Sequence, residues 1–123
     1  MIMNSNKRLP VAFFKNENDK EPVREWLMSL PLEDKKTIGV DIQTVEFGWP
    51  IGMPLCKPMT GQKGLWEVRS RLSDKRIARV LFCVQDSTMV LLHGFIKKTQ
   101  KTPDKDLKIA MKRMKGLNND KRH

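Results

Sequence analysis

Residues 91–103 read LLHGFIKKTQKTP and join an apolar strand, a cluster of lysines and the start of a helix. The apolar part is typical of a buried strand. Thr102 is a favourable N-cap, Pro103 fits the first helical position, and Asp104 suits the positive end of the helix dipole. Three lysines held between a strand end and a helix N-terminus predict an anion site.

The sequence outside this stretch predicts an α+β fold. Helices grouped before a run of hairpin strands favour a twisted antiparallel sheet with an N-terminal helical hairpin and a C-terminal helix. Pro10 predicts an edge position for the first strand, and the Pro- and Gly-rich residues 49–64 predict a loop. Hydrophobic periodicity and turn residues predict strands at 9–15, 65–72, 77–84 and 89–96 and helices at 20–29, 32–47 and 103–115.

A chain of 123 residues is one domain by size, and we expect that domain at 9–116, between a flexible N-terminus at 1–8 and a flexible tail at 117–123. No apolar run is long enough to span a membrane, and the N-terminus has no apolar signal core. We therefore expect a cytoplasmic protein in which Cys56 and Cys83 are free thiols.

The net charge of +10 is unevenly distributed along the chain. Residues 1–56 contain 7 Lys and Arg against 8 Asp and Glu, whereas residues 57–123 contain 17 against 6. The whole basic excess lies in the second half, which indicates a polyanionic partner, nucleic acid being the commonest. A solvated basic surface is the simpler alternative.

Two arginines within strands determine the expected register of the central hairpin. A two-residue turn at 74–75 would place Arg79 on the apolar face of strand 65–72, where a buried guanidinium is costly. A longer turn that sets Arg69 opposite Arg79 instead sorts the apolar residues onto one face, and we prefer this register.

In the preferred register, the exposed face of the sheet holds Arg69, Arg71 and Arg79 together with Glu67. Like charges directly opposite each other cost stability, so the arrangement implies an anion that bridges the arginines. An exposed arginine paired with Glu67 is the alternative without a ligand.

A tight turn at 86–87 would set Val80 opposite His93. His93 would then face the core, which favours a buried, hydrogen-bonded histidine over a catalytic one. Gly94 would lie beside Arg79 on the other face and leave room for a backbone or a phosphate to approach. No carboxylate cluster or Cys/His set has metal-ligand spacing, so we expect neither a metal nor another cofactor.

Three segments, GLWEVR at 64–69, RVLF at 79–82 and LHGFIKKTQKTP at 92–103, resemble the phage-Gp49-like or HigB-like branch of the RelE/ParE toxin superfamily. The resemblance covers residues 9 to about 115, and the last segment is specific to that branch. It implies a RelE-like fold and the toxin half of a type II toxin–antitoxin pair.

Family members of the RelE kind enter the ribosomal A site and cut mRNA, so the resemblance implies a metal-independent mRNA endoribonuclease that inhibits translation. Attack by a ribose 2′-OH on the adjacent phosphodiester needs a base, cations for the developing charge and an acid. The implied catalytic residues are Arg69, Arg79, Lys97, Lys98 and Lys101, and the implied RNA-binding residues are Arg71, Arg76, Gln100 and Lys105.

Within that set, we expect Arg79 to hold phosphate charge and Lys98 or Lys101 to transfer a proton, because a lysine among other cations has its neutral form favoured. The chain departs from the best-known RelE pattern, since it has no Tyr and carries Glu67 where a lysine often stands. His93, Lys98 and Lys101 all stay candidates for proton transfer. An Arg79→Ala variant should lose cutting while remaining folded.

The resemblance also implies partners: a cognate antitoxin of the helix-turn-helix repressor type, the ribosome and mRNA, operator DNA only through the antitoxin, and no membrane. A ParE-like inhibitor of DNA gyrase without nuclease activity is the alternative function. A nucleic-acid-binding protein without catalysis is a third hypothesis. Converging cations favour the nuclease, since a gyrase inhibitor has no need for them.

Overall fold

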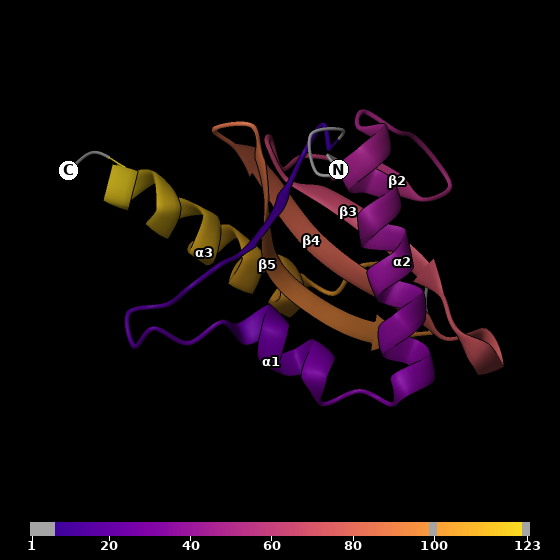
Figure 1. The fold of residues 1–123 in the computed structure, drawn as a ribbon. Helices are drawn as coiled ribbons and strands as arrows, with labels where there is room; N and C mark the ends of the chain where they lie inside the picture. The colour runs from indigo at the N-terminus through magenta and orange to yellow at the C-terminus, as the bar shows by residue number, and fades with distance from the viewer. Residues whose placement is uncertain (1–6, 99–100, 122–123) are drawn as a thin grey trace, which may run out of the picture.

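The computed structural model describes residues 7–98 and 101–121, with side chains described to residue 117. Within these ranges the chain forms a five-stranded sheet with helices on both of its faces (Figure 1). The elements in chain order are β1 (Val11–Phe13), α1 (Pro22–Met28), α2 (Leu32–Gly48), β2 (Cys56–Pro58), β3 (Trp66–Arg71), a 3₁₀ turn (Ser73–Lys75), β4 (Ile77–Gln85), β5 (Thr88–Lys97) and α3 (Asp104–Lys121).

The sheet has the strand order β1-β5-β4-β3-β2 and is mixed rather than fully antiparallel. β1 pairs parallel to β5, while the pairs from β5 to β2 are antiparallel. The edge position expected for the first strand from Pro10 is confirmed, but the expected all-antiparallel pairing is wrong at that edge. β2 was not expected, because its three residues lie within the Pro- and Gly-rich segment that predicted a loop.

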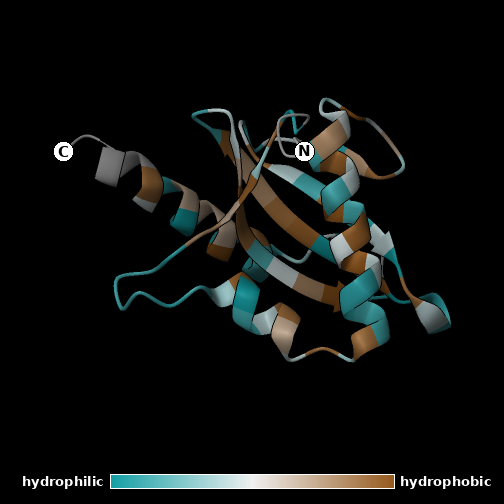
Figure 2. Ribbon diagram, in the orientation of Figure 1, coloured by the Kyte–Doolittle hydropathy of each residue, from teal (hydrophilic) through white to brown (hydrophobic). Residues whose placement is uncertain are grey.

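The two faces of the sheet bury separate apolar clusters. On one face, residues such as Val68, Val80 and Phe82 pack under α1 and α2. On the other face, Leu81 and Leu92 pack under Ala110 of α3. The hydropathy colouring in Figure 2 shows this pattern, with hydrophobic residues along the central strands. An α+β fold is therefore confirmed.

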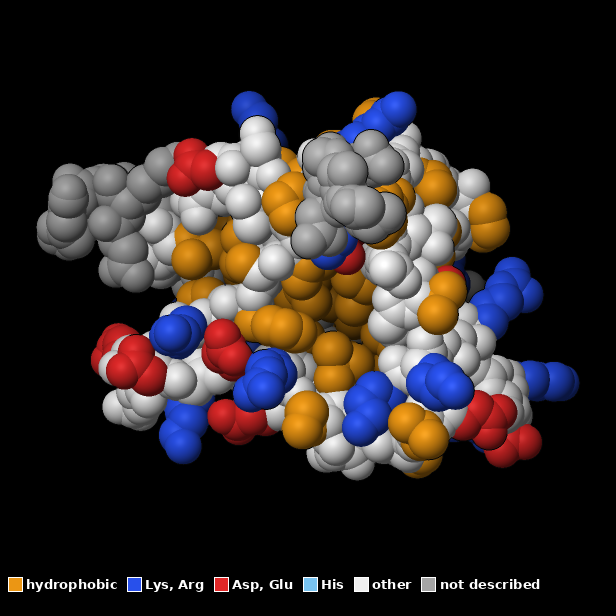
Figure 3. All heavy atoms as spheres, viewed as in Figure 1, with side chains coloured by type: hydrophobic (Ala, Val, Ile, Leu, Met, Phe, Trp, Pro, Cys, Tyr) orange, Lys and Arg blue, Asp and Glu red, His pale blue; other side chains and the backbone are white. Residues whose placement is uncertain are grey.

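The helices of the first cluster rest on different strands. α1 contacts β5 and β1, and α2 contacts β3. The expected antiparallel helical hairpin is not confirmed. Figure 3 shows hydrophobic side chains gathered in a hollow between these two helices, with Lys and Arg side chains along its lower rim.

Glu46, near the end of α2, holds the N-terminal segment against the sheet. Its backbone carbonyl accepts hydrogen bonds from the N–H groups of Arg8 and Leu9, at 2.8 and 3.0 Å. Its carboxylate accepts one from the N–H of Val11 at 2.8 Å and lies 3.3 Å from Lys7 Nζ. Residues 7 and 8, expected within a flexible end, are therefore attached to the domain.

The register of the β3–β4 hairpin agrees with the sequence prediction. Arg69 lies opposite Arg79, and five residues, 72–76, connect the strands in place of a two-residue turn. The cost of burying a guanidinium among apolar groups thus predicted the correct pairing.

The register of the β4–β5 hairpin differs from the prediction. The turn at 86–87 is tight, with positive φ at both residues, but a β-bulge adds Leu92 to β5. His93 consequently lies opposite Leu81, and Gly94 opposite Val80. The two residues exchange faces, because one extra residue reverses the alternation of a strand.

Gly94 therefore faces α1 and not a ligand. A side chain at this position would collide with the indole ring of Trp26. The space that the sequence predicted for a phosphate is occupied by an aromatic ring, and the prediction for Gly94 was wrong.

We expect Gly94→Ala to destabilise the domain by about 1–3 kcal/mol, since forcing a methyl group into a filled core displaces its neighbours. Urea unfolding of the variant measures this loss. Gly116→Ala is the matched control, because nothing within 4 Å obstructs a Cβ there. Equal unfolding midpoints for the two variants would contradict the packing of Trp26 on Gly94.

Both cysteines are buried and unpaired, as expected. Cys83 lies in the cluster under α3, and burial raises the pKa of each thiol to about 11. α3 continues beyond Gly116, which the sequence predicted as its end, to Lys121. None of the described helices is long and apolar enough to cross a membrane.

Candidate functional site

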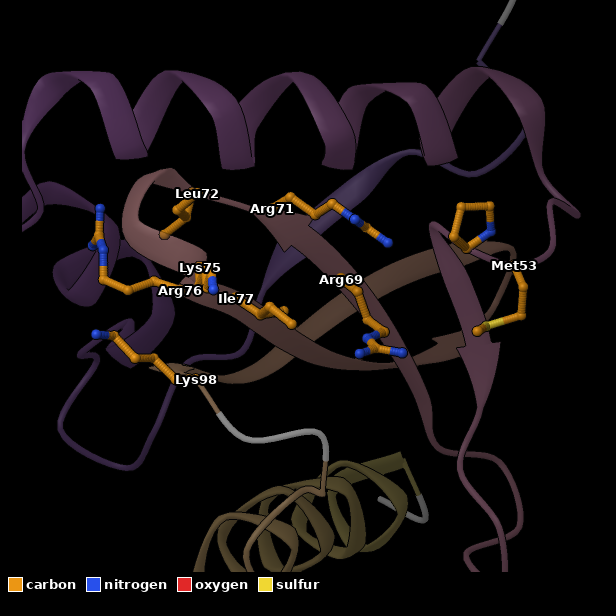
Figure 4. Close-up of a pocket in the computed structure, with 9 residues that line it drawn as sticks. Met53, Arg69, Arg71, Leu72, Lys75, Arg76, Ile77 and Lys98 are labelled. Carbon is orange, nitrogen blue, oxygen red and sulfur yellow. The ribbon is translucent and has the colours of Figure 1, made fainter.

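A groove of about 620 Å³ opens at the end of the sheet where β3 ends and β4 begins. Figure 4 shows it between α2 and α3, with β3 and β4 crossing behind it. Its lining residues are Met53, Pro54, Arg69, Arg71, Leu72, Lys75, Arg76, Ile77 and Lys98. Five of these nine side chains are cationic and none is acidic, so the groove has the composition of an anion-binding site.

The cations of the groove come from three segments of the chain. Arg69 and Arg71 are two residues apart on β3, and in Figure 4 Arg71 extends toward the Met53 side whereas Arg69 points down, toward α3. Arg76 belongs to the connection between β3 and β4, and Lys98 directly follows β5. Residues distant in sequence thus meet at one end of the sheet.

The sequence predicted that the face of the sheet with the arginines is exposed. In the structure, only part of this face is exposed. α3 covers most of it, and the side chain of Arg79 is 0% exposed. Arg71 is exposed, and the side chain of Arg69 is 17% exposed within the groove. The expectation of an exposed side chain was correct for Arg71, only partly met by Arg69, and wrong for Arg79.

The anion that bridges the paired arginines belongs to the chain itself. Glu67, whose side chain is 1% exposed, places Oε1 at 3.8 Å from Nε of Arg69 and Oε2 at 3.6 Å from Nε of Arg79. Thr102 donates a hydrogen bond from its hydroxyl to the same Oε2 at 2.9 Å. The alternative in which an arginine pairs with Glu67 therefore holds, although the pair is buried.

Burial lowers the pKa of Arg79, and the nearby charge of Glu67 opposes that shift. Arg69 adds a smaller lowering effect, because it is a like charge. The charge of Glu67 thus compensates in part for a guanidinium that has been removed from water.

Arg76 lines the groove but is held by α2. Its two terminal nitrogens donate to the two carboxylate oxygens of Asp34, at 2.9 and 3.1 Å. This hydrogen bonding raises the pKa of Arg76. Asp34 is buried and was missed by the sequence analysis, since an acidic residue in the first turn of a helix is ordinarily read as a partner of the helix dipole.

The other lysines of the predicted set do not line the groove. Lys97 is half-buried at the end of β5, opposite Ile77. Lys101 is exposed before α3, and Lys105 is exposed in its first turn. Gln100 lies outside the described residues. The groove therefore unites Arg69, Arg71, Arg76 and Lys98 of the predicted set.

His93 lies under the N-terminal turn of α3. It shares a hydrogen bond of 2.6 Å between its Nε2 and Oδ1 of Asp106, and its ring stacks on Phe95. The expectation of a hydrogen-bonded histidine is confirmed, but the ring faces α3 rather than the cluster under α1 and α2. Thr102 is not the N-cap that the sequence predicted, since α3 begins at Asp104 and the hydroxyl is directed to Glu67.

Among the described residues, no group of three or more His, Cys, Asp and Glu side chains is placed to hold a metal ion.

The fold and the groove define a small α+β protein with a cationic groove at the end of a mixed sheet. The family described as Phage derived protein Gp49-like (DUF891) matches residues 25–115, from within α1 to within α3. The chain belongs to this family, which is part of the RelE/ParE-like toxin superfamily. The family is associated with the toxins of toxin–antitoxin systems, which implies an antitoxin partner. A search of curated proteins gave no match.

Proposed function

We propose that the protein is the toxin of a type II toxin–antitoxin system and acts as a ribosome-dependent, metal-independent mRNA endoribonuclease of the HigB-like kind. The observation that carries this proposal is the groove, in which cations from β3, from the β3–β4 connection and from the end of β5 meet. A phosphodiester in such a groove has positive charge on several sides. That arrangement suits the charge that develops on phosphate during strand cleavage.

The proposed reaction is transfer of the phosphodiester to the neighbouring ribose. A base takes the proton of the 2′-OH, the 2′-oxygen bonds to phosphorus, and the bond from phosphorus to the 5′-oxygen breaks. An acid gives the leaving 5′-oxygen a proton, and the products are a 2′,3′-cyclic phosphate and a 5′-hydroxyl. In this proposal Arg69 and Arg71 bind the phosphate, and Lys98 or Lys101 transfers a proton.

Arg79 has an indirect part in the proposal. Its side chain is fully buried beside Glu67, so it supports the groove from behind rather than touching the phosphate. Lys97, a catalytic candidate from the sequence, does not line the groove, so we propose it with Lys105 and Gln100 as a flanking contact to RNA. The partners would be the ribosome and mRNA in the cytoplasm, together with a helix-turn-helix antitoxin that also connects the toxin to operator DNA.

The test is a reconstituted translation reaction with one defined mRNA, followed by primer extension across it. We expect cuts near the ribosomal A site when the purified protein and ribosomes are both present, and none when ribosomes are omitted. Blocked translation with intact mRNA, or DNA breaks in a parallel reaction with gyrase, would contradict the nuclease proposal and favour a ParE-like inhibitor.

A further inference from the structure

We propose that Glu67 is a positioning residue whose one buried carboxylate orients Arg69 in the groove and attaches Thr102, before α3, to the sheet. The test by mRNA cleavage rests on the proposed function. The orientation of Arg69 by Glu67 can be tested without that function. No sequence motif points to this role, because a glutamate among arginines on a strand reads as an ordinary ion pair.

The three partners of Glu67 come from three different elements. Arg69 is on β3 and Arg79 is on β4. Thr102 lies two residues before the start of α3. A carboxylate that is 1% exposed is stable only where charges and hydrogen bonds compensate for lost water. The same compensation therefore fixes the relative placement of the three elements.

Arg69 is the groove residue whose orientation we assign to Glu67. The carboxylate lies beside Nε of this arginine, at 3.8 Å. The guanidinium of Arg69 lies at the end of the side chain in the groove, where Figure 4 draws it. Glu67 restricts a long side chain to an orientation that suits a bidentate contact with phosphate.

Thr102 is the second residue through which Glu67 acts on the region of the groove. Lys98 lines the groove. Lys101 is the residue directly before Thr102, and both lysines lie between β5 and α3 in the sequence. Thr102 is 7% exposed, and its hydroxyl attaches the end of this connection to the sheet by the 2.9 Å hydrogen bond to Glu67. Loss of the hydroxyl would remove the contact that joins Thr102, next to Lys101, to the carboxylate beside Arg69.

The decisive variant is Thr102→Val, which keeps the shape of the side chain and removes the hydroxyl. We expect the maximal rate of mRNA cleavage on programmed ribosomes to fall by about 10- to 100-fold, since small misplacements of reacting groups are costly, while the half-saturating protein concentration changes little. Thr102→Ser is the matched control and should cleave near the wild-type rate, because it keeps the hydroxyl. All rates are measured at a temperature where each variant is fully folded.

A second readout is independent of nuclease activity. The side-chain Nε–H signal of Arg69 in a ¹⁵N NMR spectrum should shift in Thr102→Val and not in Thr102→Ser. If the wild-type protein does not cut mRNA, the proposed function fails, and the NMR comparison still decides the positioning role. Identical Arg69 signals in the valine and serine variants would overturn that role.

Glu67→Gln provides a second test, since it keeps an acceptor for Thr102 and removes the charge that both arginines face. It should shift the Arg69 signal and lower the maximal cleavage rate by at least as much as Thr102→Val. An unshifted signal in this variant would equally overturn the proposal, and the valine variant decides the matter if glutamine prevents folding.

Discussion

Arg79→Ala should lower the free energy of unfolding by about 3 kcal/mol. The guanidinium is fully buried, and its removal leaves the carboxylate of Glu67 inside the protein without its closest arginine. Breaking a buried ion pair by removing one partner costs ~3–5 kcal/mol. Arg69 stays 3.8 Å from the other carboxylate oxygen, which keeps the loss near the lower end of that range. Urea unfolding followed by circular dichroism measures the change.

Two further variants separate the charge effect from simple truncation. In Arg79→Met combined with Glu67→Gln, both charges are gone while the space stays filled, and most of the stability should return. Arg24→Ala is the surface control. Its side chain is 58% exposed and lies 4.0 Å from Glu21, so its loss should change stability by less than about 0.5 kcal/mol. An Arg79→Ala variant as stable as Arg24→Ala would show that the buried pair contributes nothing.

This expectation replaces the one drawn from the sequence, in which Arg79→Ala stays folded and loses only its cutting activity. The sequence predicted the register of Arg79 correctly, because the cost of placing a guanidinium among apolar residues selects the pairing with Arg69. It did not predict burial, because the alternation of a strand tells which residues share a face and not whether a distant helix covers that face. α3 covers it.

The β4–β5 hairpin shows a second limit of the sequence. Turn residues at 86–87 specify where a hairpin reverses, and that prediction was correct. A bulge at Leu92 has no comparable sequence signal, yet it moves His93 to the α3 side and Gly94 to the Trp26 side. One unpredicted residue thus changed the interpretation of the two residues that follow it.

The site itself was predicted in part, for a physical reason. Charge segregation along the chain and lysines after a strand are local features, so the groove cations Arg69, Arg71, Arg76 and Lys98 could be predicted. Asp34, which holds Arg76, lies on a distant helix and was not predicted, whereas Glu67 was considered only as the partner of an exposed arginine and proved to be buried. Sequence patterns indicate that charges accumulate, whereas tertiary structure decides which of them are compensated.

Arg69→Ala should reduce the rate of mRNA cleavage by about 100- to 1,000-fold, the range for removal of one donor from a site that stabilises transition-state charge. Arg69 lines the groove and is 17% exposed, and its Nε lies 3.8 Å from the buried carboxylate that we propose as its positioning partner. Preorganised donors contribute most to catalysis because they need no reordering when charge develops. Single-turnover cleavage on programmed ribosomes measures the rate.

Arg69→Lys distinguishes charge from geometry at the same position. Lysine keeps the positive charge but replaces a planar fork of donors with a single ammonium group, so it should recover only part of the activity. Arg24→Ala, on α1, removes an arginine from a different part of the surface and should cleave at the wild-type rate. If Arg69→Ala cuts within about threefold of Arg24→Ala, the groove is not the site of phosphate stabilisation. If Arg69→Lys matches wild type, net charge rather than bidentate binding explains the role of this residue.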